Sequence, residues 1–307
     1  MTGDKEINAT LEAIDKGVLD FQDAIPEIQQ RIYSRLMLFS KELQVQGGTI
    51  TNSAKNIRML GRLKSDLYQI ILDDSDYMES VSQFAELYGK VDKLNAAYFK
   101  ALEKKFTPPK IVNEIQKQSV SLVLEGLTEA GLEANLINPV REIINTYVTT
   151  GGSYSKLATE LGNYITGYQS DAGMVEGQLQ KFTRQITTDA INQYSATVNE
   201  VMTQDLGWEW YRYQGSNVRD TRTFCEALKK KKYFHRSEMS RIIKGDFQEF
   251  RDMKGKIYDK TGLPQGMYDD TNTSNFLQYR GGYNCGHQAY PIPAALVPAS
   301  VRKAVGK

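Results

Sequence analysis

Hydrophobic residues recur every three or four positions through the first hundred residues, which is the spacing of one face of a helix. The longest stripe consists of Ile7, Leu11, Ile14, Val18, Phe21, Ile25, Ile28, Ile32, Leu36, Phe39 and Leu43. A step of about 3.5 residues predicts a coiled-coil seam or a long bundle helix. Pro26 interrupts the stripe, because proline lacks a backbone N–H and its ring clashes with the preceding turn. We therefore expect two helices or one kinked helix, ended by Gly47 and Gly48.

Two further stripes follow, over residues 57–70 and 81–102. The Asp-Asp-Ser-Asp cluster at 73–76 separates them and offers side chains that cap the next helix. Pro108 and Pro109 close the third stripe, because a double proline cannot continue a helix. Residues 1–107 are therefore predicted to form an elongated helical hairpin or bundle. Its stripes either bury one another or form a surface for partner subunits.

The helical pattern continues from 108 to 207 in shorter pieces, cut by Gly126, Gly131 and Pro139. It gives way at 208–214, where alternating aromatic residues predict a strand with Trp208 and Trp210 on one face. Residues 237–253 are expected to form a helix capped by Ser237. The predicted fold is thus mainly α, with an elongated N-terminal bundle (1–107), a helical middle region (108–207) and a small α+β C-terminal domain (208–307).

Both cysteines and both histidines of the chain lie in this last segment. Cys285 and His287 are two positions apart, so an extended backbone would point both toward one ion. A thiolate and an imidazole suit tetrahedral zinc, and Cys225 with His235 would complete a closed four-ligand structural site. Three alternatives stay open. The spacing of Cys225 and His235 is wider than that of the usual zinc-finger ligand pairs, so His235 could be an ordinary surface histidine. The cysteines could be free, buried and apolar in character, or Cys225 and Cys285 could form a disulfide, which the lack of a recognisable secretion signal disfavours.

Charge and hydropathy exclude several classes of function. The formal net charge is +1, so no global field predicts a nucleic-acid or membrane partner. No apolar run is long enough to span a bilayer, and we expect a soluble protein made in a reducing compartment. The sequence contains no HExxH, P-loop or nucleophile-elbow motif. We therefore predict a protein that is not an enzyme.

A local excess of positive charge leaves nucleic-acid binding open as an alternative. Residues 229–260 contain eleven Lys or Arg against five Asp or Glu, with aromatic residues between them. Such a run could follow a phosphate backbone or could simply be a solvated charged loop. The residues predicted to contact nucleic acid are Lys229, Lys230, Lys231, Lys232 and Arg236.

Three motifs are arranged as in a known family. An Arg- and Thr-rich helical pattern spans 183–189, an Asp-x-Arg-Thr segment lies at 220–223 with Cys225 close behind, and an Asn-Cys-Gly-His signature lies at 284–287. Over roughly residues 153–293 the chain resembles the phage Mu F-like head morphogenesis proteins, the minor capsid proteins of tailed phages. Asp220, Arg222 and Asn284 match structural positions of those motifs. Gly286 stands where the family has Arg, and Lys229 and Lys230 replace its Asp-Gly turn.

The resemblance implies a low-copy virion component, made in the host cytoplasm, that joins the inner side of the procapsid near the portal vertex. It would bind the portal protein and major capsid or scaffold subunits, and assist head assembly or genome delivery. Some relatives are thought to associate with double-stranded DNA. Related domains also occur fused to toxins, so a toxin- or nuclease-type effector is the alternative.

Overall fold

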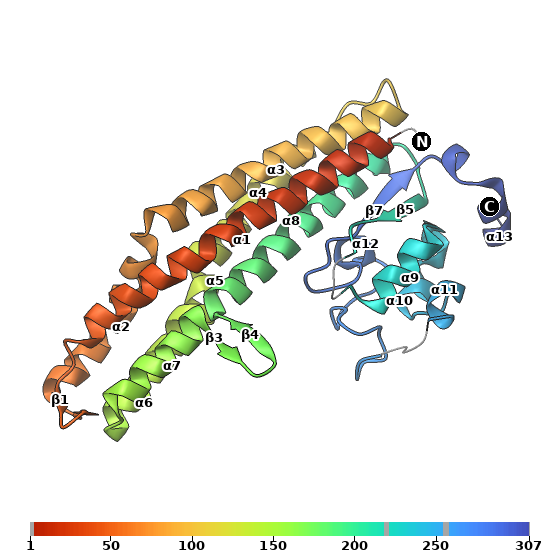
Figure 1. Ribbon diagram of the computed structural model, residues 1–307. Coiled ribbons are helices and arrows are strands. Elements are labelled where there is room, and N and C mark those ends of the chain that lie inside the picture. Colours follow the sequence, from red (N-terminus) through yellow and green to blue (C-terminus); the bar gives the residue numbers. More distant parts are fainter. Residues whose placement is uncertain (1–2, 218–220, 254–257, 307) are drawn as a thin grey trace. The chain divides into compact units, whose positions relative to one another are not determined.

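The computed structural model describes residues 3–217, 221–253 and 258–306, and it confirms the mainly α fold (Figure 1). The longer helices are α1 (Asp4–Ser40), α2 (Ala54–Leu72), α3 (Ser75–Leu102), α4 (Ile111–Thr128), α6 (Asn138–Thr150), α7 (Tyr154–Thr166) and α8 (Gln178–Gln204). α1 is a single helix that contains Pro26, and Gly126 lies within α4. None of the helices in the described part of the chain is both long enough and apolar enough to cross a membrane.

The chain forms two compact units that are not consecutive in sequence. Unit 1 comprises Met1–Lys16, Leu87–Val120 and Thr188–Lys307, and unit 2 comprises Gly17–Glu86 and Ser121–Thr187. The helices α1, α3, α4 and α8 each contribute residues to both units. The division therefore does not follow the three segments read from the sequence (1–107, 108–207 and 208–307), because long helices from distant parts of the chain pack along one another.

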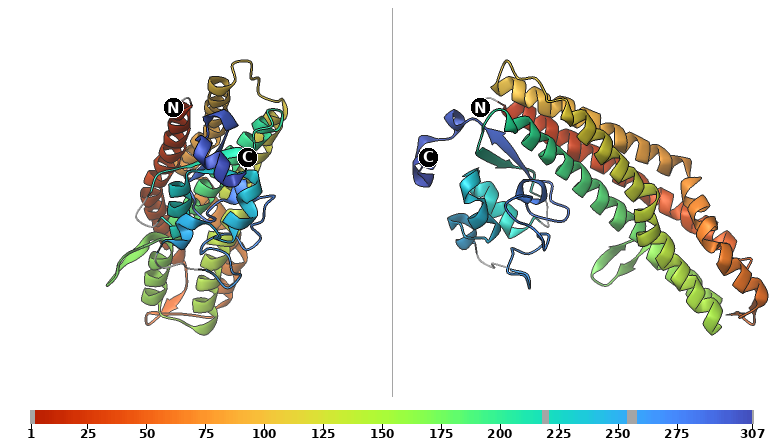
Figure 2. Two further views of the ribbon diagram at one scale, coloured as in Figure 1. Left: turned by 90° about the vertical axis from the view of Figure 1, so that its right-hand side faces the viewer. Right: turned by 180° about the vertical axis from the view of Figure 1, so that it is seen from behind.

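Unit 2 contains two small hairpins beside its helices. Val45–Gln46 (β1) pairs with Thr49–Ile50 (β2) around Gly47 and Gly48, which both have positive φ, as a two-residue hairpin turn requires. Gly167–Ser170 (β3) pairs with Gly173–Glu176 (β4), a hairpin that directly follows α7 (Figure 2) and that hydrophobic periodicity did not predict. The remaining short segment, α5 (Ala130–Leu132) and the π-helical turn Glu133–Ile137, leads into α6.

A bidentate polar contact in unit 2 joins Arg31 of α1 to Asp74, the residue before α3. Arg31 donates from Nε and Nη2 to the two carboxylate oxygens, each at 2.9 Å, and Asp74 also accepts from the backbone N–H of Tyr77 at 3.1 Å. Asp74 therefore caps α3 while holding α1 in register. The hydrogen bond from Arg31 lowers the pKa of Asp74, against the opposing effect of burial.

Replacing Asp74 by Asn should destabilise unit 2 by about 2 kcal/mol at pH 7, since a cap and a bidentate pair both weaken. The folded-state pKa lies below the unfolded one, so this contribution is complete above about pH 4 and is lost as the pH falls through the folded-state pKa. The difference between wild type and Asp74→Asn, measured by denaturant unfolding, should thus disappear in acid. Asp76 also contacts Arg31 but is 61% exposed, so Asp76→Asn is the matched control and should cost under about 1 kcal/mol. Equal losses in both variants would contradict this account.

The C-terminal part of unit 1 is built on a three-stranded antiparallel sheet in the order β6–β5–β7. The central strand is β5 (Trp210–Gln214), flanked by β6 (Tyr233–His235) and β7 (Gln288–Ile292). The predicted aromatic strand is confirmed, although Trp208 lies just before it and stacks on Phe99. The short helices around the sheet are α9 (Thr223–Lys231), η2 (Arg236–Glu238), α10 (Met239–Ile243), α11 (Gln248–Arg251), α12 (Phe276–Tyr279), η3 (Ala294–Leu296) and α13 (Ala299–Val305).

The predicted helix over 237–253 is wrong in its continuity and in its cap. The segment divides into η2, α10 and α11, and Gly245 between the last two has φ +66°, which a helix does not allow. The capping residue is His235, whose ring accepts a hydrogen bond from the backbone N–H of Ser237. In return, the Glu238 carboxylate accepts a hydrogen bond from the backbone N–H of His235. Ser237 therefore lies inside η2, two residues after the residue that caps it.

Candidate metal centre

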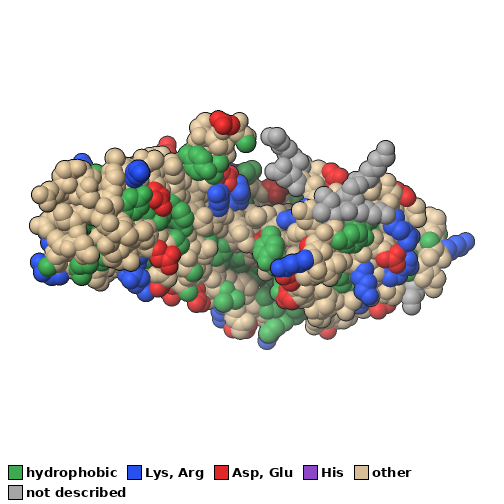
Figure 3. All heavy atoms as spheres, turned by 90° about the horizontal axis from the view of Figure 1, so that it is seen from below, with side chains coloured by type: hydrophobic (Ala, Val, Ile, Leu, Met, Phe, Trp, Pro, Cys, Tyr) green, Lys and Arg blue, Asp and Glu red, His purple; other side chains and the backbone are tan. Residues whose placement is uncertain are grey.

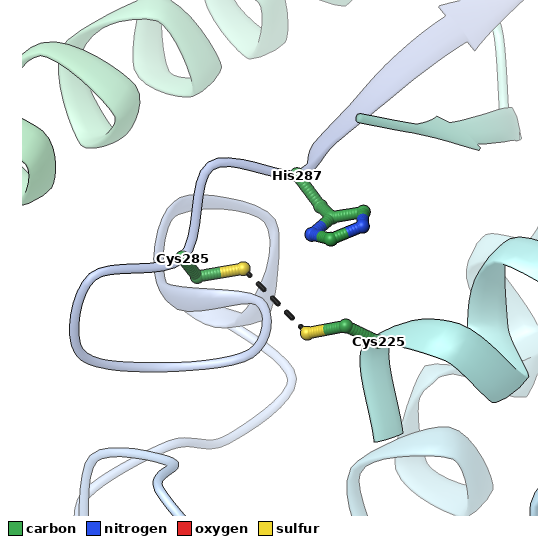
Figure 4. Close-up of side chains that lie close together, drawn as sticks. All are labelled: Cys225, Cys285 and His287. Atoms are coloured by element: carbon green, nitrogen blue, oxygen red, sulfur yellow. Dashed lines mark hydrogen bonds between the residues drawn. The ribbon is translucent and has the colours of Figure 1, made fainter. Parts of the chain in front are cut away.

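Cys225, Cys285 and His287 point toward one another from two separate parts of the C-terminal sequence (Figure 4). Cys225 lies in the first turn of α9, Cys285 in the loop between α12 and β7, and His287 directly before β7. All three are buried, with exposed fractions of 2%, 4% and 4%. Donor atoms from the three side chains all lie within 4.8 Å of one another. The predicted meeting of the two distant cysteines is thus confirmed.

The spacing of the two sulfurs suits a shared metal ion. The Sγ atoms are 3.7 Å apart, and two sulfurs each about 2.3 Å from a tetrahedral zinc would lie about 3.8 Å apart. The same distance is far too long for a disulfide, whose sulfurs lie about 2.05 Å apart. The cysteines are accordingly free thiols in this structure, and the disulfide alternative is not what the structure contains.

Glycine at position 281 lets the two sulfurs meet. A Cβ atom on Gly281 would lie 2.3 Å from the Cys225 sulfur and 2.9 Å from the Cys285 sulfur, so any larger residue would displace them. The backbone of this loop is held by Arg222, whose guanidinium donates to the carbonyl oxygens of Gly281 at 3.0 Å and Tyr283 at 2.5 Å. Arg222 thus joins the start of α9 to the loop that carries Cys285.

Asn284, the other predicted motif residue within the described chain, shapes the same loop. Its φ of +55° is left-handed, a conformation that Asn tolerates better than most residues. Its backbone N–H donates to Asp189 of α8 at 2.6 Å. Burial raises the pKa of Asp189, which the hydrogen bond from Tyr268 opposes. Asp220, the third motif residue, lies outside the described residues.

The ring of His287 is oriented by its neighbours. Nε2 lies 3.4 Å from the side-chain oxygen of Asn217, and the ring stacks on Tyr213 with the planes 5° apart. A ligating histidine commonly donates its second ring N–H to an outer oxygen, which fixes the tautomer. In the tautomer in which Nε2–H donates to Asn217, Nδ1 is the ring nitrogen left to bind a metal ion.

The two cysteines differ in the direction in which their pKa values shift. The hydrogen bond from Cys225 lowers the pKa of Cys285 well below its usual range, with His287 and Arg280 contributing and burial opposing. The interaction with Cys285, together with burial, raises the pKa of Cys225 well above its usual range. A cation bound between the two sulfurs would favour the thiolate form of both and expel the thiol protons.

His235, the expected fourth ligand, is not part of this group. His235 lies opposite Trp210 in the pairing of β5 with β6. Trp210 lies three residues before Tyr213, whose hydroxyl contacts both sulfurs. His235 is therefore about 10 Å along the strand from the position of Tyr213. Its Nδ1 lies 2.8 Å from the Ser237 hydroxyl and its Nε2 3.3 Å from Glu209. The four-ligand prediction is corrected to three of its residues, because the sheet register directs His235 into a helix cap.

Replacing His235 by Asn should leave zinc stoichiometry and affinity unchanged, since Asn preserves the capping function and removes only the imidazole. Isothermal titration of wild type and variant with zinc measures this directly. A fall in affinity of tenfold or more in His235→Asn would place His235 back among the ligands.

The predicted nucleic-acid-binding residues lie at the C-terminal end of α9 and directly after β6. Several of them form hydrogen bonds or ion pairs with other residues of the protein. Lys231 pairs with Glu238 at 3.0 Å, and Arg236 contacts Glu200 at 3.2 Å. Lys229 donates to Asn217, while Lys230 and Lys232 are exposed. On the face in Figure 3, basic and acidic side chains are interspersed. Lys254 and Lys256 of the same run lie outside the described residues. Contact with DNA stays a prediction.

Sequence reasoning did not single out three residues that shape the centre, namely Tyr213, Asn217 and Gly281. The alternation in β5 places Tyr213 on the same strand face as Tyr211, which is a signal available in advance. Asn217 and Gly281 lie in loops, where no periodicity indicates which side chain or lack of one matters.

No family model, curated protein or solved structure matches this chain. The resemblance to phage head morphogenesis proteins stays a prediction that rests on the motifs.

Proposed function

We propose that Cys225, Cys285 and His287 bind a zinc ion with a structural purpose. The observation that carries the proposal is the 3.7 Å spacing of two buried sulfurs beside an oriented imidazole. Bound there, zinc would join α9 to the loop before β7, two segments about sixty residues apart in the chain. Burial of all three donors favours a structural role over a catalytic one, because a reacting water or substrate needs access to the metal.

Metal analysis of the intact protein tests this proposal. Protein purified without chelator should contain one zinc ion per chain, and binding should compete with a chelator of known affinity. Absence of zinc from the purified chain, together with no binding on titration, would overturn the metal centre. Zinc that exchanges rapidly and carries a solvent water would instead indicate a catalytic site.

We further propose that the chain is a minor head protein of a tailed phage that binds the portal or inner capsid. Support comes from the order of the three motifs and from the contacts of Arg222 and Asn284, which shape the loop bearing the closing signature. The amphipathic helices of the N-terminal half provide the surface for partner subunits. The activity would be binding and assembly, with the metal keeping the C-terminal module rigid.

Particle fractionation tests the assembly role. In lysates of the host that produces the particles, the protein should sediment with assembled heads and a portal ring at low copy number. Heads assembled without the portal should contain less of it. Recovery only as free protein, from lysates rich in assembled heads, would contradict the proposal while leaving the metal centre untouched.

A further inference from the structure

We propose that the hydroxyl oxygen of Tyr213 is the fourth donor of the metal centre, an inference that rests on the proposed zinc site. A structural zinc ion is almost always four-coordinate. The site residues supply two sulfurs and one nitrogen, and His235 is engaged elsewhere. A centre whose three donors are at most 4% exposed is better closed by a protein atom than by exchanging water.

Tyr213 presents its oxygen at the required place. Its Oη lies 3.6 Å from the Cys225 sulfur and 3.8 Å from the Cys285 sulfur, and the sulfurs are 3.7 Å apart. The three atoms therefore form a nearly equilateral triangle. For tetrahedral zinc with Zn–S about 2.3 Å and Zn–O about 2.0 Å, the expected edges are about 3.8 Å between sulfurs and about 3.5 Å from sulfur to oxygen. The triangle matches one face of that tetrahedron, and His287, whose ring nitrogen lies within 4.8 Å of both sulfurs, would supply the fourth ligand.

The fold holds Tyr213 firmly in this position. It lies in the central strand β5, opposite Ala289 of β7, and is 1% exposed. Its ring stacks on His287 with centroids 5.4 Å apart. Gly215, two residues on, lies so close to His287 that a Cβ there would approach its ring to 2.8 Å. Tyr213 and His287 are therefore positioned together by one strand pair, so neither needs a large movement to reach a shared ion.

The chemistry is consistent with a phenolate that forms only when metal binds. Burial raises the pKa of the free hydroxyl well above its usual range, and in this structure that hydroxyl donates a hydrogen bond to the Cys225 sulfur. A bound cation reverses this preference, and the phenol proton leaves to solvent as the oxygen–metal bond forms. Two thiolates and one phenolate around Zn²⁺ give a net charge of −1. The guanidinium of Arg280, 2% exposed and donating to two carbonyl oxygens, supplies a buried positive charge near Tyr213 and Cys285.

Zinc titration of wild type and Tyr213→Phe tests the assignment. Zinc has no absorption bands of its own in the near ultraviolet, so a tyrosinate difference band that grows to one equivalent reports directly on phenolate ligation. The band should appear in wild type and be absent from Tyr213→Phe, which should also release one proton fewer in calorimetry. Affinity should fall by about tenfold or more, at or beyond the range for loss of an outer-shell partner.

Tyr211→Phe is the matched control, because Tyr211 is equally buried in the same strand but directs its hydroxyl to Arg236. It should keep the tyrosinate band and wild-type affinity. Zinc binding without the band in wild type would overturn the role of Tyr213 alone. Lack of zinc binding by wild type and both variants would instead overturn the metal centre itself.

Discussion

Replacement of Cys285 by Ser should abolish tight zinc binding and destabilise the C-terminal part of unit 1. Serine keeps the shape of the side chain but removes one of the two sulfur ligands of the proposed zinc ion. With free zinc at a thousand times the dissociation constant, bound metal contributes about 4 kcal/mol to folding, and the variant loses that contribution. The only two tryptophans, Trp208 and Trp210, lie in unit 1, so their fluorescence reports on the affected region.

The decisive comparison is with wild type treated with a chelator. Chelation should lower the unfolding temperature of wild type to that of Cys285→Ser and leave the variant unchanged. Cys225→Ser should behave in the same way, because both sulfurs occupy one site. If Cys285→Ser were as stable as zinc-loaded wild type, and merely lost an activity, the centre would be catalytic and the structural assignment would be wrong.

Replacement of Gly281 by Ala should disable the metal centre without removing any ligand. The new methyl group would lie 2.3 Å from one sulfur and 2.9 Å from the other, closer than real contacts allow, so the sulfurs must separate. We expect a loss of zinc affinity of at least about a hundredfold, since ligand geometry tolerates shifts of only about 0.2 Å. The apo protein should lose about 1–3 kcal/mol from overpacking.

Gly286 provides the matched control in the same loop. A Cβ there meets no atom within 4 Å, so Gly286→Ala should bind zinc with wild-type affinity. The contrast separates local crowding from any general effect of alanine in this segment. Wild-type zinc affinity in Gly281→Ala would show that the two sulfurs do not share an ion. Equal losses in both variants would point to loop flexibility as the cause.

The elements that could be predicted from the sequence are those whose hydrophobic residues follow a regular local pattern. The stripes in the first hundred residues correctly indicated long helices, because each turn of a buried helix repeats the same hydrophobic requirement. The aromatic alternation at 208–214 identified the central strand for a similar reason. The β3–β4 hairpin was not predicted, because all residues of its two strands are partly or fully exposed and their sequence shows no hydrophobic periodicity.

The residues of the metal centre were likewise predictable only where a local pattern indicated them. Cys285 and His287 were identifiable as a pair, because side chains two positions apart on an extended backbone point to the same side. The wide spacing of Cys225 and His235 made this pair the weaker part of the prediction, but spacing alone did not decide whether His235 is a ligand. The choice depended on strand register, which placed His235 opposite Trp210 and left Tyr213 against the sulfurs. Register is a property of strand pairs, so it cannot be read from either segment alone.

Local sequence pattern alone established a mainly helical chain with one aromatic strand and a C-terminal part that contains the Cys and His residues. Hydrophobic periodicity and the type of each donor side chain can be read from neighbouring positions of the sequence. Tertiary structure alone decided which donors meet, which glycine must be small, and how the units divide the long helices. These outcomes depend on distances between residues far apart in the chain. Such distances follow from packing and strand pairing that involve many segments at once, and no single stretch of sequence encodes them.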